Sequence, residues 1–157
     1  PKEVSPLVPA LQSYWLWLHV SITLIGEAFL AVAFVASLLY LFSREKGPDD
    51  RQAQIRKEKL DLLAYRAVAI GFPLFTLGAL VFGMIWANQA WGRYWGWDPK
   101  EVWSLITWLF YALYLHTRLV MGWKGKKSAL IAVLGFLSAL FTFFGVNYLL
   151  SGLHSYV

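Results

Sequence analysis

Four long apolar stretches dominate the chain and limit the folds open to it. A helix needs about 20 apolar residues to cross a bilayer, and such stretches occupy residues 14–42, 62–87, 99–121 and 128–149. Only 15% of the residues are charged, against about 25% in an average soluble domain. The sequence therefore predicts an all-α, polytopic membrane protein with four transmembrane helices, forming a single domain over residues 1–157.

The distribution of Lys and Arg predicts the orientation of these helices. Six basic residues lie in the first connection, residues 43–61, and four in the third, residues 117–127, out of fourteen in the chain. By the positive-inside rule, both connections are cytoplasmic. Both chain ends and the segment between the second and third helices then face outward. We interpret the basic residues as a signal for orientation in a lipid bilayer, and we expect no nucleic-acid partner.

The external segment, expected at residues 88–103, is unusually rich in tryptophan. In "WGRYWGW", Trp91, Trp95 and Trp97 alternate with two glycines. An aromatic belt at the membrane surface explains one or two tryptophans, but it does not explain this alternation. Glycine lets a backbone approach a ligand closely, and indoles offer broad apolar faces. The segment is therefore expected to form an external shelf for a large planar hydrophobic ligand.

"WDPKE" at the end of this segment carries a helix start. Asp98 suits the N-cap, Pro99 the first helical position and Glu101 the third, as in a variant capping box. Asp98 and Glu101 therefore have two interpretations, as ligand contacts or as residues that only start the third span. Arg93 and Lys100 likewise either hold anionic groups of a ligand or are solvated charges.

Two of the three histidines are expected at the level of the tryptophan shelf. His19 lies near the outer end of the first span, and His154 lies just beyond the outer end of the fourth. A lone histidine is usually a satisfied polar residue, but two at matched depth beside an aromatic shelf favour joint ligation of one metal. Imidazole suits iron, and iron beside flat aromatic side chains suggests haem.

His116 belongs to a different depth. It lies 17 residues beyond Pro99, so it is roughly 26 Å further along the helix axis at 1.5 Å per residue. It therefore cannot bind the same metal as His19 and His154. An ionisable group inside a span is a functional candidate, and a hydrogen bond to a neighbouring helix is the alternative. Glu27, eight residues after His19, is expected to be a buried polar contact or a proton relay.

These residues also resemble a known family. "WANQAWGRYWGWDPKEVWSLITWLFYALYLH" is similar to the tryptophan-rich "WWD" signature of the haem-handling proteins that assemble c-type cytochromes. The form "WDPKE" followed by "LITWLFYALYLH" resembles the CcsA/ResC branch of system II cytochrome c biogenesis more than the CcmC or CcmF proteins of system I. The upstream "LHV" and the downstream "GVNYLLSGLHSY" also fit, so the resemblance covers essentially the whole chain.

The resemblance implies a role for each candidate residue. His19 and His154 would be the catalytic axial ligands of an outer haem b, and His116 would be a ligand of an inner haem. The haem-contacting positions of the signature are Trp91, Trp95, Trp97 and Asp98. The partner of His116 would lie on another span, or on a CcsB/ResB-type membrane partner or fused portion. The chain would thus be the C-terminal part of a larger assembly in a bacterial cytoplasmic membrane, or in its organellar equivalent, the thylakoid.

The same resemblance implies an activity, holocytochrome c synthase. Haem would enter near His116, pass to the outer shelf, and be joined there to the CxxCH cysteines of apocytochrome c as thioethers. The chain itself has no cysteine, which agrees with thiols supplied by the substrate. Two alternatives remain: a haem exporter or chaperone without ligase activity, and a structural subunit whose tryptophans form only an interface belt.

Overall fold

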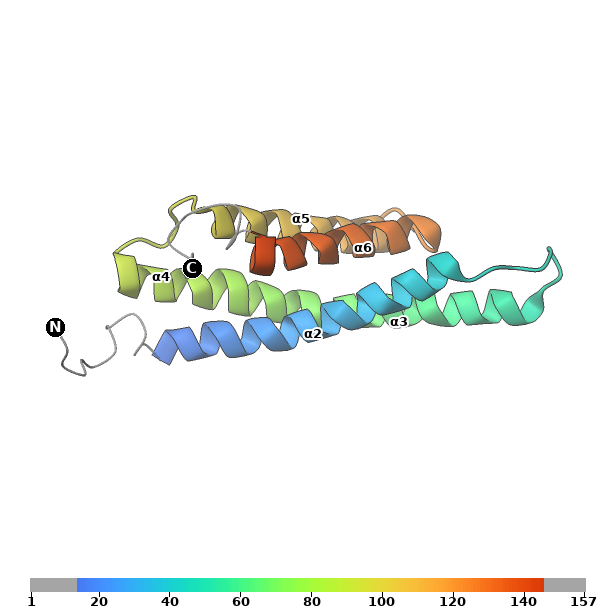
Figure 1. Ribbon diagram of the computed structural model, residues 1–157, viewed down its shortest axis with the longest axis horizontal. Helices are drawn as coiled ribbons and strands as arrows, with labels where there is room; N and C mark the ends of the chain where they lie inside the picture. The colour runs from blue at the N-terminus through green and yellow to red at the C-terminus, as the bar shows by residue number, and fades with distance from the viewer. Residues whose placement is uncertain (1–13, 146–157) are drawn as a thin grey trace.

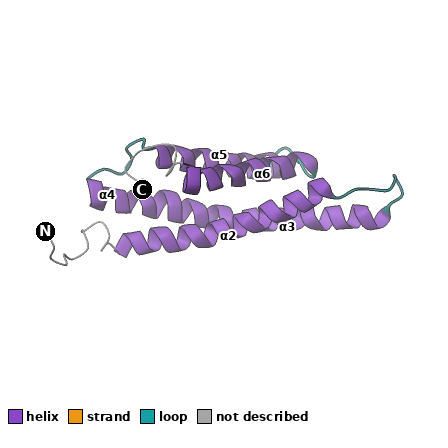
Figure 2. Cartoon of the chain, viewed as in Figure 1, coloured by secondary structure: helices purple, strands orange, loops and turns teal. Residues whose placement is uncertain are grey.

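The computed structural model describes residues 14–145, and this part of the chain is helical, without a β-strand (Figure 2). Its elements, in which η denotes a π-helix, are α2 (Tyr14–Phe42), α3 (Arg51–Phe75), η1 (Thr76–Phe82), α4 (Gly83–Trp91), α5 (Pro99–Leu119), α6 (Lys126–Leu140) and η2 (Phe141–Gly145). Since α3, η1 and α4 follow one another without a break, they form one long rod, as do α6 and η2 (Figure 1).

Three described helical stretches are long and apolar enough to cross a membrane: Tyr14–Phe42, Arg51–Trp91 and Lys126–Gly145. This confirms an all-α membrane protein. Helix α5, which coincides with the third expected span, is not among the three. Its Trp, Tyr, Thr and His residues lower its hydropathy, although it runs alongside the other helices (Figure 1).

The second expected span, 62–87, proves to be the middle of a longer helical rod. The rod begins at Arg51, because the Asp50 side chain caps it by accepting the N–H of Ala53 at 3.2 Å. The backbone N–H groups of Lys46 and Ala53 hold the pKa of Asp50 below its usual range. Hydropathy misses these first turns because they are polar. The end of the fourth expected span, at residue 149, lies outside the described residues.

Small residues let the helices approach closely. Helix α2 packs against α3, η1 and α6, and α5 packs against α6. A Cβ at Gly26 would lie 2.7 Å from the backbone nitrogen of Phe75, and one at Gly78 would lie 2.5 Å from that of Thr23. Apolar burial provides little drive between helices inside a lipid bilayer, so such close backbone packing is a main source of helix association there.

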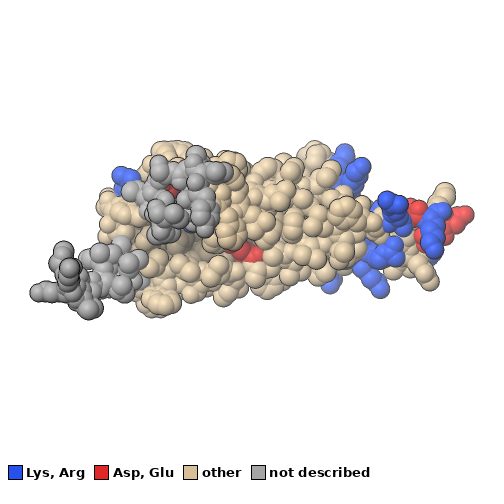
Figure 3. All heavy atoms as spheres, in the orientation of Figure 1, with Lys and Arg blue, Asp and Glu red and all other residues tan. Residues whose placement is uncertain are grey.

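The two ends of the bundle differ in charge. Lys and Arg side chains gather at the end formed by the α2–α3 and α5–α6 connections, and the middle of the visible face is almost uncharged (Figure 3). Both basic connections thus lie at one end, as the sequence predicts. The opposite end carries the start of α2, helix α4 and the start of α5 (Figure 1).

Candidate functional site

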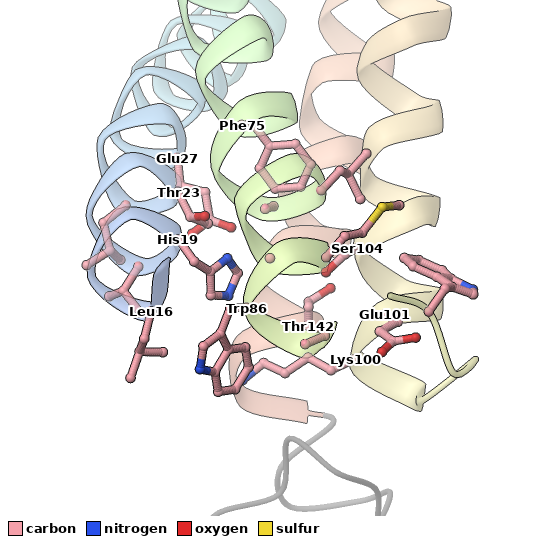
Figure 4. Close-up of a pocket in the computed structure, with 18 of the residues that line it drawn as sticks. Leu16, His19, Thr23, Glu27, Phe75, Trp86, Lys100, Glu101, Ser104 and Thr142 are labelled. Carbon is pink, nitrogen blue, oxygen red and sulfur yellow. The ribbon is translucent and has the colours of Figure 1, made fainter. Parts of the chain in front are cut away.

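A cavity of about 250 Å³ opens at the end of the bundle away from the basic connections. It lies between α2, η1, α4, the start of α5 and η2 (Figure 4). Most of its lining is apolar, and the residues that bring polar groups to it are His19, Thr23, Glu27, Tyr94, Trp95, Lys100, Glu101, Ser104 and Thr142. Figure 4 shows His19, Thr23 and Glu27 in succession along α2, with Lys100 reaching from α5 toward Trp86.

His19 is held in this cavity by a residue far away in the sequence. Its Nδ1 atom lies 2.9 Å from the carbonyl oxygen of Gly78 in η1. A carbonyl oxygen only accepts hydrogen bonds, so Nδ1 carries the proton and donates it. In the neutral imidazole, this arrangement leaves the lone pair on Nε2. Metal-binding histidines commonly have one nitrogen fixed in this way while the other binds the metal.

Two glycines make this hydrogen bond possible. Gly78 lies against the backbone of α2 at Thr23, one helical turn after His19, so its carbonyl comes within reach of the imidazole. Gly83 lies against the ring itself, because a Cβ there would be 3.0 Å from His19 Nδ1 and 3.1 Å from Cε1. Both glycines belong to the turns where the rod is π-helical or returns to α-helix.

Trp86 forms a further wall beside His19. The two rings are nearly parallel, with centroids 5.9 Å apart and an angle of 8° between their planes. Trp86 is 3% exposed, and Trp91 packs edge-on against it at 4.9 Å. Trp91, expected to contact a ligand, therefore supports Trp86 and is not among the residues that line the cavity.

Trp95 and Trp97 occupy different environments. Trp95 lines the cavity, whereas Trp97 is 68% exposed. Their rings are 5.5 Å apart and perpendicular, so these two indoles do not form one flat shelf. Trp97 also has a φ of 54°, a left-handed conformation that costs a non-glycine residue roughly 1–2 kcal/mol.

Asp98 and Glu101 start α5 as the sequence predicts. Asp98 is the N-cap, and its carboxylate accepts the N–H of Lys100 at 3.1 Å. Glu101 reaches back beyond the cap and accepts the N–H of Gly96 at 2.8 Å. Both carboxylates therefore fix the loop of the external segment. Arg93 lies against Gly96 in the same loop.

The cavity contains polar atoms that the described protein leaves unsatisfied. Within residues 14–145, the Thr23 hydroxyl and the Trp95 indole N–H are buried without a hydrogen-bond partner. Native proteins rarely leave such groups unpaired, and a bound ligand or water usually satisfies them. Lys100 stands beside them, with its ammonium 5.6 Å from the centre of the Phe143 ring. The cavity therefore suits a mainly apolar ligand that carries a few polar groups.

His116 lies at the other end of the bundle, three residues before the end of α5. It is exposed, so it faces away from the described helices. Arg118, two residues further on, pairs with Asp61 of α3 through bonds of 2.8 and 2.7 Å. Asp61 also accepts the N–H of Gly125 at 3.0 Å, which ties α3, α5 and the α5–α6 connection together. His116 and His19 thus belong to opposite ends.

The structure brings His19 and Trp95 together in one cavity, whereas Trp91 and Trp97 do not line it. His154, the expected second outer ligand, lies outside the described residues. Sequence reasoning missed Gly78 and Gly83. It quoted Trp86 as the first residue of the signature without assigning it a role, and it gave Glu27 no definite place. The available signal was a pair of glycines and a tryptophan in the second span at the expected depth of His19.

Comparisons with known proteins point to one family. Residues 1–154 match the family described as "Cytochrome C assembly protein". A relative from Chlamydomonas reinhardtii, "Cytochrome c biogenesis protein CcsA", is 50% identical over 99% of this chain and 45% of its own length. Proteins of the same name from Prochlorococcus marinus (strain MIT 9301) and Cyanophora paradoxa are 44% and 39% identical, with 58% and 61% of their lengths covered. The chain thus spans roughly half to three-fifths of these relatives.

Proposed function

The chain belongs to the cytochrome c assembly protein family, and on that premise we propose that it holds haem for attachment to apocytochrome c. The outer cavity takes one edge of the haem, with His19 as an axial ligand of the iron. His154 supplies the second axial ligand from the segment after η2. The observation that carries this proposal is the His19 imidazole in the cavity, with Nδ1 bound to a backbone carbonyl 2.9 Å away.

The proposed topology has four spans, with α5 as the third. At 21 residues, α5 is about 32 Å long, enough to cross a hydrocarbon core of about 30 Å. The basic connections face the cytoplasm, and the cavity faces outward. In this arrangement residues 1–157 act as one haem-handling domain of a larger assembly. We place that assembly in a bacterial cytoplasmic membrane or a thylakoid membrane.

The residues in the cavity fit haem, here haem b as the substrate. The volume of the cavity, about 250 Å³, is below the roughly 300–1,000 Å³ of complete small-molecule pockets. The cavity therefore suits one edge of a macrocycle. The Trp95 N–H and the Lys100 ammonium suit a carboxylate at that edge. Trp86 provides an apolar wall beside the axial imidazole. Asp98 and Glu101 hold the loop that carries Trp95 and Trp97.

The proposed reaction joins haem to the CxxCH motif of apocytochrome c. Each cysteine thiol adds across a vinyl group: sulfur bonds to one vinyl carbon, the thiol proton goes to the other, and no electrons are lost or gained. The chain holds haem in position for the incoming thiols inside a protected cavity. Positioning two reactants in this way lowers the barrier of their reaction. One axial histidine is then replaced by the histidine of CxxCH. This activity is that of a holocytochrome c synthase.

His116 serves a second, inner site in this proposal. It faces away from the described bundle on α5, where a bare imidazole in lipid would be unfavourable. We assign this face to a CcsB/ResB-type membrane partner or fused portion, which would supply the second ligand of an inner haem. Haem would enter at this site and move outward to His19.

An exporter or chaperone that delivers haem without joining it is the second candidate. The exposed His116 at the inner end favours it, because transfer between two depths needs a ligand at each. A purified assembly that converts apocytochrome c and reduced haem into covalent holocytochrome would support ligation. Delivery of haem without a covalent product would support the exporter.

The first test is an absorption spectrum of the detergent-purified assembly, oxidised and then reduced with dithionite. We expect a low-spin haem with two histidine ligands in the wild type and its loss or conversion in His19→Ala and His154→Ala. Val81→Ala, an exposed change in η1, serves as the matched control. An unchanged spectrum in both histidine variants would remove the outer site from the proposal, and the tryptophans would revert to an interface belt.

A further inference from the structure

The rod formed by α3, η1 and α4 carries a group of residues that fits around the His19 imidazole. Three of its residues meet the ring: the Gly78 carbonyl at Nδ1, the bare α-carbon of Gly83 against Nδ1 and Cε1, and the indole of Trp86 parallel to the ring. All three belong to residues 78–86, whereas His19 lies 59 residues before Gly78.

We propose that Gly78, Gly83 and Trp86 are positioning residues that fix His19 as the Nδ1–H tautomer and present Nε2 to the iron. The proposal rests on the function proposed above, because it assumes that His19 binds haem iron. It assigns a role to the π-helix η1, whose widened turn brings Gly78 and Gly83 to the same imidazole. A hydrogen bond from Nδ1–H to a carbonyl also makes the imidazole a stronger electron donor to a metal.

The geometry explains why both positions are glycine. A Cβ at position 78 would lie 2.5 Å from the Thr23 backbone nitrogen, so any side chain would force η1 away from α2 and stretch the bond to His19. A Cβ at position 83 would lie 3.0 Å from Nδ1, tighter than ordinary contact, so the ring would have to shift. Gly78 thus sets the distance of the carbonyl, and Gly83 leaves space for the ring.

A chemical-rescue experiment in the purified assembly tests the hydrogen bond directly. In a His19→Gly variant loaded with haem, imidazole or 1-methylimidazole is added, and the return of the low-spin spectrum is titrated. Both compounds ligate iron through one nitrogen, but only imidazole retains an N–H for the Gly78 carbonyl. We expect imidazole to bind about fivefold more tightly than 1-methylimidazole, equivalent to about 1 kcal/mol for one hydrogen bond. Haem in detergent micelles gives the intrinsic ratio for normalisation.

The outcomes separate this inference from the proposed function. Equal normalised affinities would overturn the role of Gly78 while leaving His19 as a ligand. A His19→Gly variant with the wild-type spectrum would instead sink the proposed ligation itself. Gly83→Ala, with His19 intact, gives a second measurement if the rescue variant fails to fold or holds no haem. It should lower the low-spin fraction and shift the haem midpoint potential upward, whereas Val81→Ala should change neither. A wild-type potential and spectrum in Gly83→Ala would contradict the inference.

Discussion

At the basic end of the bundle Arg118 and Asp61 meet through two hydrogen bonds of 2.8 and 2.7 Å, whereas at the cavity end His19 meets the Gly78 carbonyl through one of 2.9 Å. The first contact joins two full charges with 8% and 12% exposed side chains. The second joins a ring N–H to a backbone carbonyl at the wall of a cavity. The basic end is thus closed by a contact within the protein, whereas the cavity end places an imidazole in the wall of a cavity.

The backbone shows the same contrast. At the basic end, the Asp61 carboxylate also accepts the N–H of Gly125. Gly125 is the N-cap of α6 and has a φ of 72°, which a glycine adopts readily. At the cavity end, Gly92 takes the left-handed conformation at the end of α4, and so does Trp97, a bulky residue that disfavours it. Strained residues persist where surrounding structure holds them, and they concentrate at functional sites. The comparison teaches that one end of the bundle is secured by an ion pair, whereas the other holds one exposed indole, Trp97, in a strained backbone conformation.

The largest expected effect comes from breaking the closed end. Arg118→Ala leaves the half-buried Asp61 carboxylate without its partner, and we expect a loss of about 3 kcal/mol in the free energy of unfolding. Unfolding of the purified assembly in a denaturing-detergent titration measures it. The double variant Asp61→Leu with Arg118→Met removes both charges and should be more stable than Arg118→Ala. A single variant as stable as the wild type would show that the pair does not secure this end.

The second test removes the close approach at the cavity end. Gly78→Ala places a Cβ against the backbone of Thr23, and overpacking of this kind costs about 1–3 kcal/mol. We also expect the low-spin haem spectrum to weaken, because η1 moves away from His19. Leu77→Ala, an exposed neighbour in the same π-helix, is the control. If Gly78→Ala matches it in both stability and spectrum, the α2–η1 contact does not position His19.

Much of the fold follows from the sequence. The first apolar stretch coincides with α2, and the Asp98-Pro99 pair starts α5 where local capping rules place it. The second rod is longer than its apolar stretch because a cap at Asp50 extends it through polar turns. The π-helices had no local signal, since a π-helix differs from an α-helix by a hydrogen-bond spacing that is one residue longer, and this leaves hydropathy unchanged.

The candidate site was only partly accessible to sequence reasoning. His19 and Trp95 were expected at the same depth, and they share the cavity. Local spacing does not reveal that Gly78 lies beside His19, because the contact joins residues 59 apart. The tryptophans also look equivalent in the sequence, yet Trp91 supports another indole and Trp97 is exposed. Those differences depend on the path of the loop, which Glu101 and Trp97 set together.

The third test concerns that loop. Glu101→Ala removes the carboxylate that accepts the Gly96 N–H, and a hydrogen bond to a charged acceptor contributes about 1.5 kcal/mol. Backbone amides of residues 92–98 should then exchange with deuterium about tenfold faster, as measured by mass spectrometry. Glu101→Gln keeps an acceptor oxygen without the charge and should fall between. Unchanged exchange in Glu101→Ala would mean that the loop is held by other contacts.

The smallest expected effect separates the strain at Trp97 from its indole. Trp97→Ala removes the side chain but keeps a Cβ in the left-handed conformation, whereas Trp97→Gly removes both. Since Trp97 is 68% exposed, little packing is lost in either variant. Trp97→Gly should therefore be more stable than Trp97→Ala by about 1 kcal/mol, as measured by thermal unfolding of the assembly. If both variants also lose cytochrome c maturation equally, the indole is needed for function, and the strained backbone serves to hold it in an exposed position. If Trp97→Gly is no more stable than Trp97→Ala, the backbone at position 97 is not strained, and the two ends of the bundle do not differ in backbone strain.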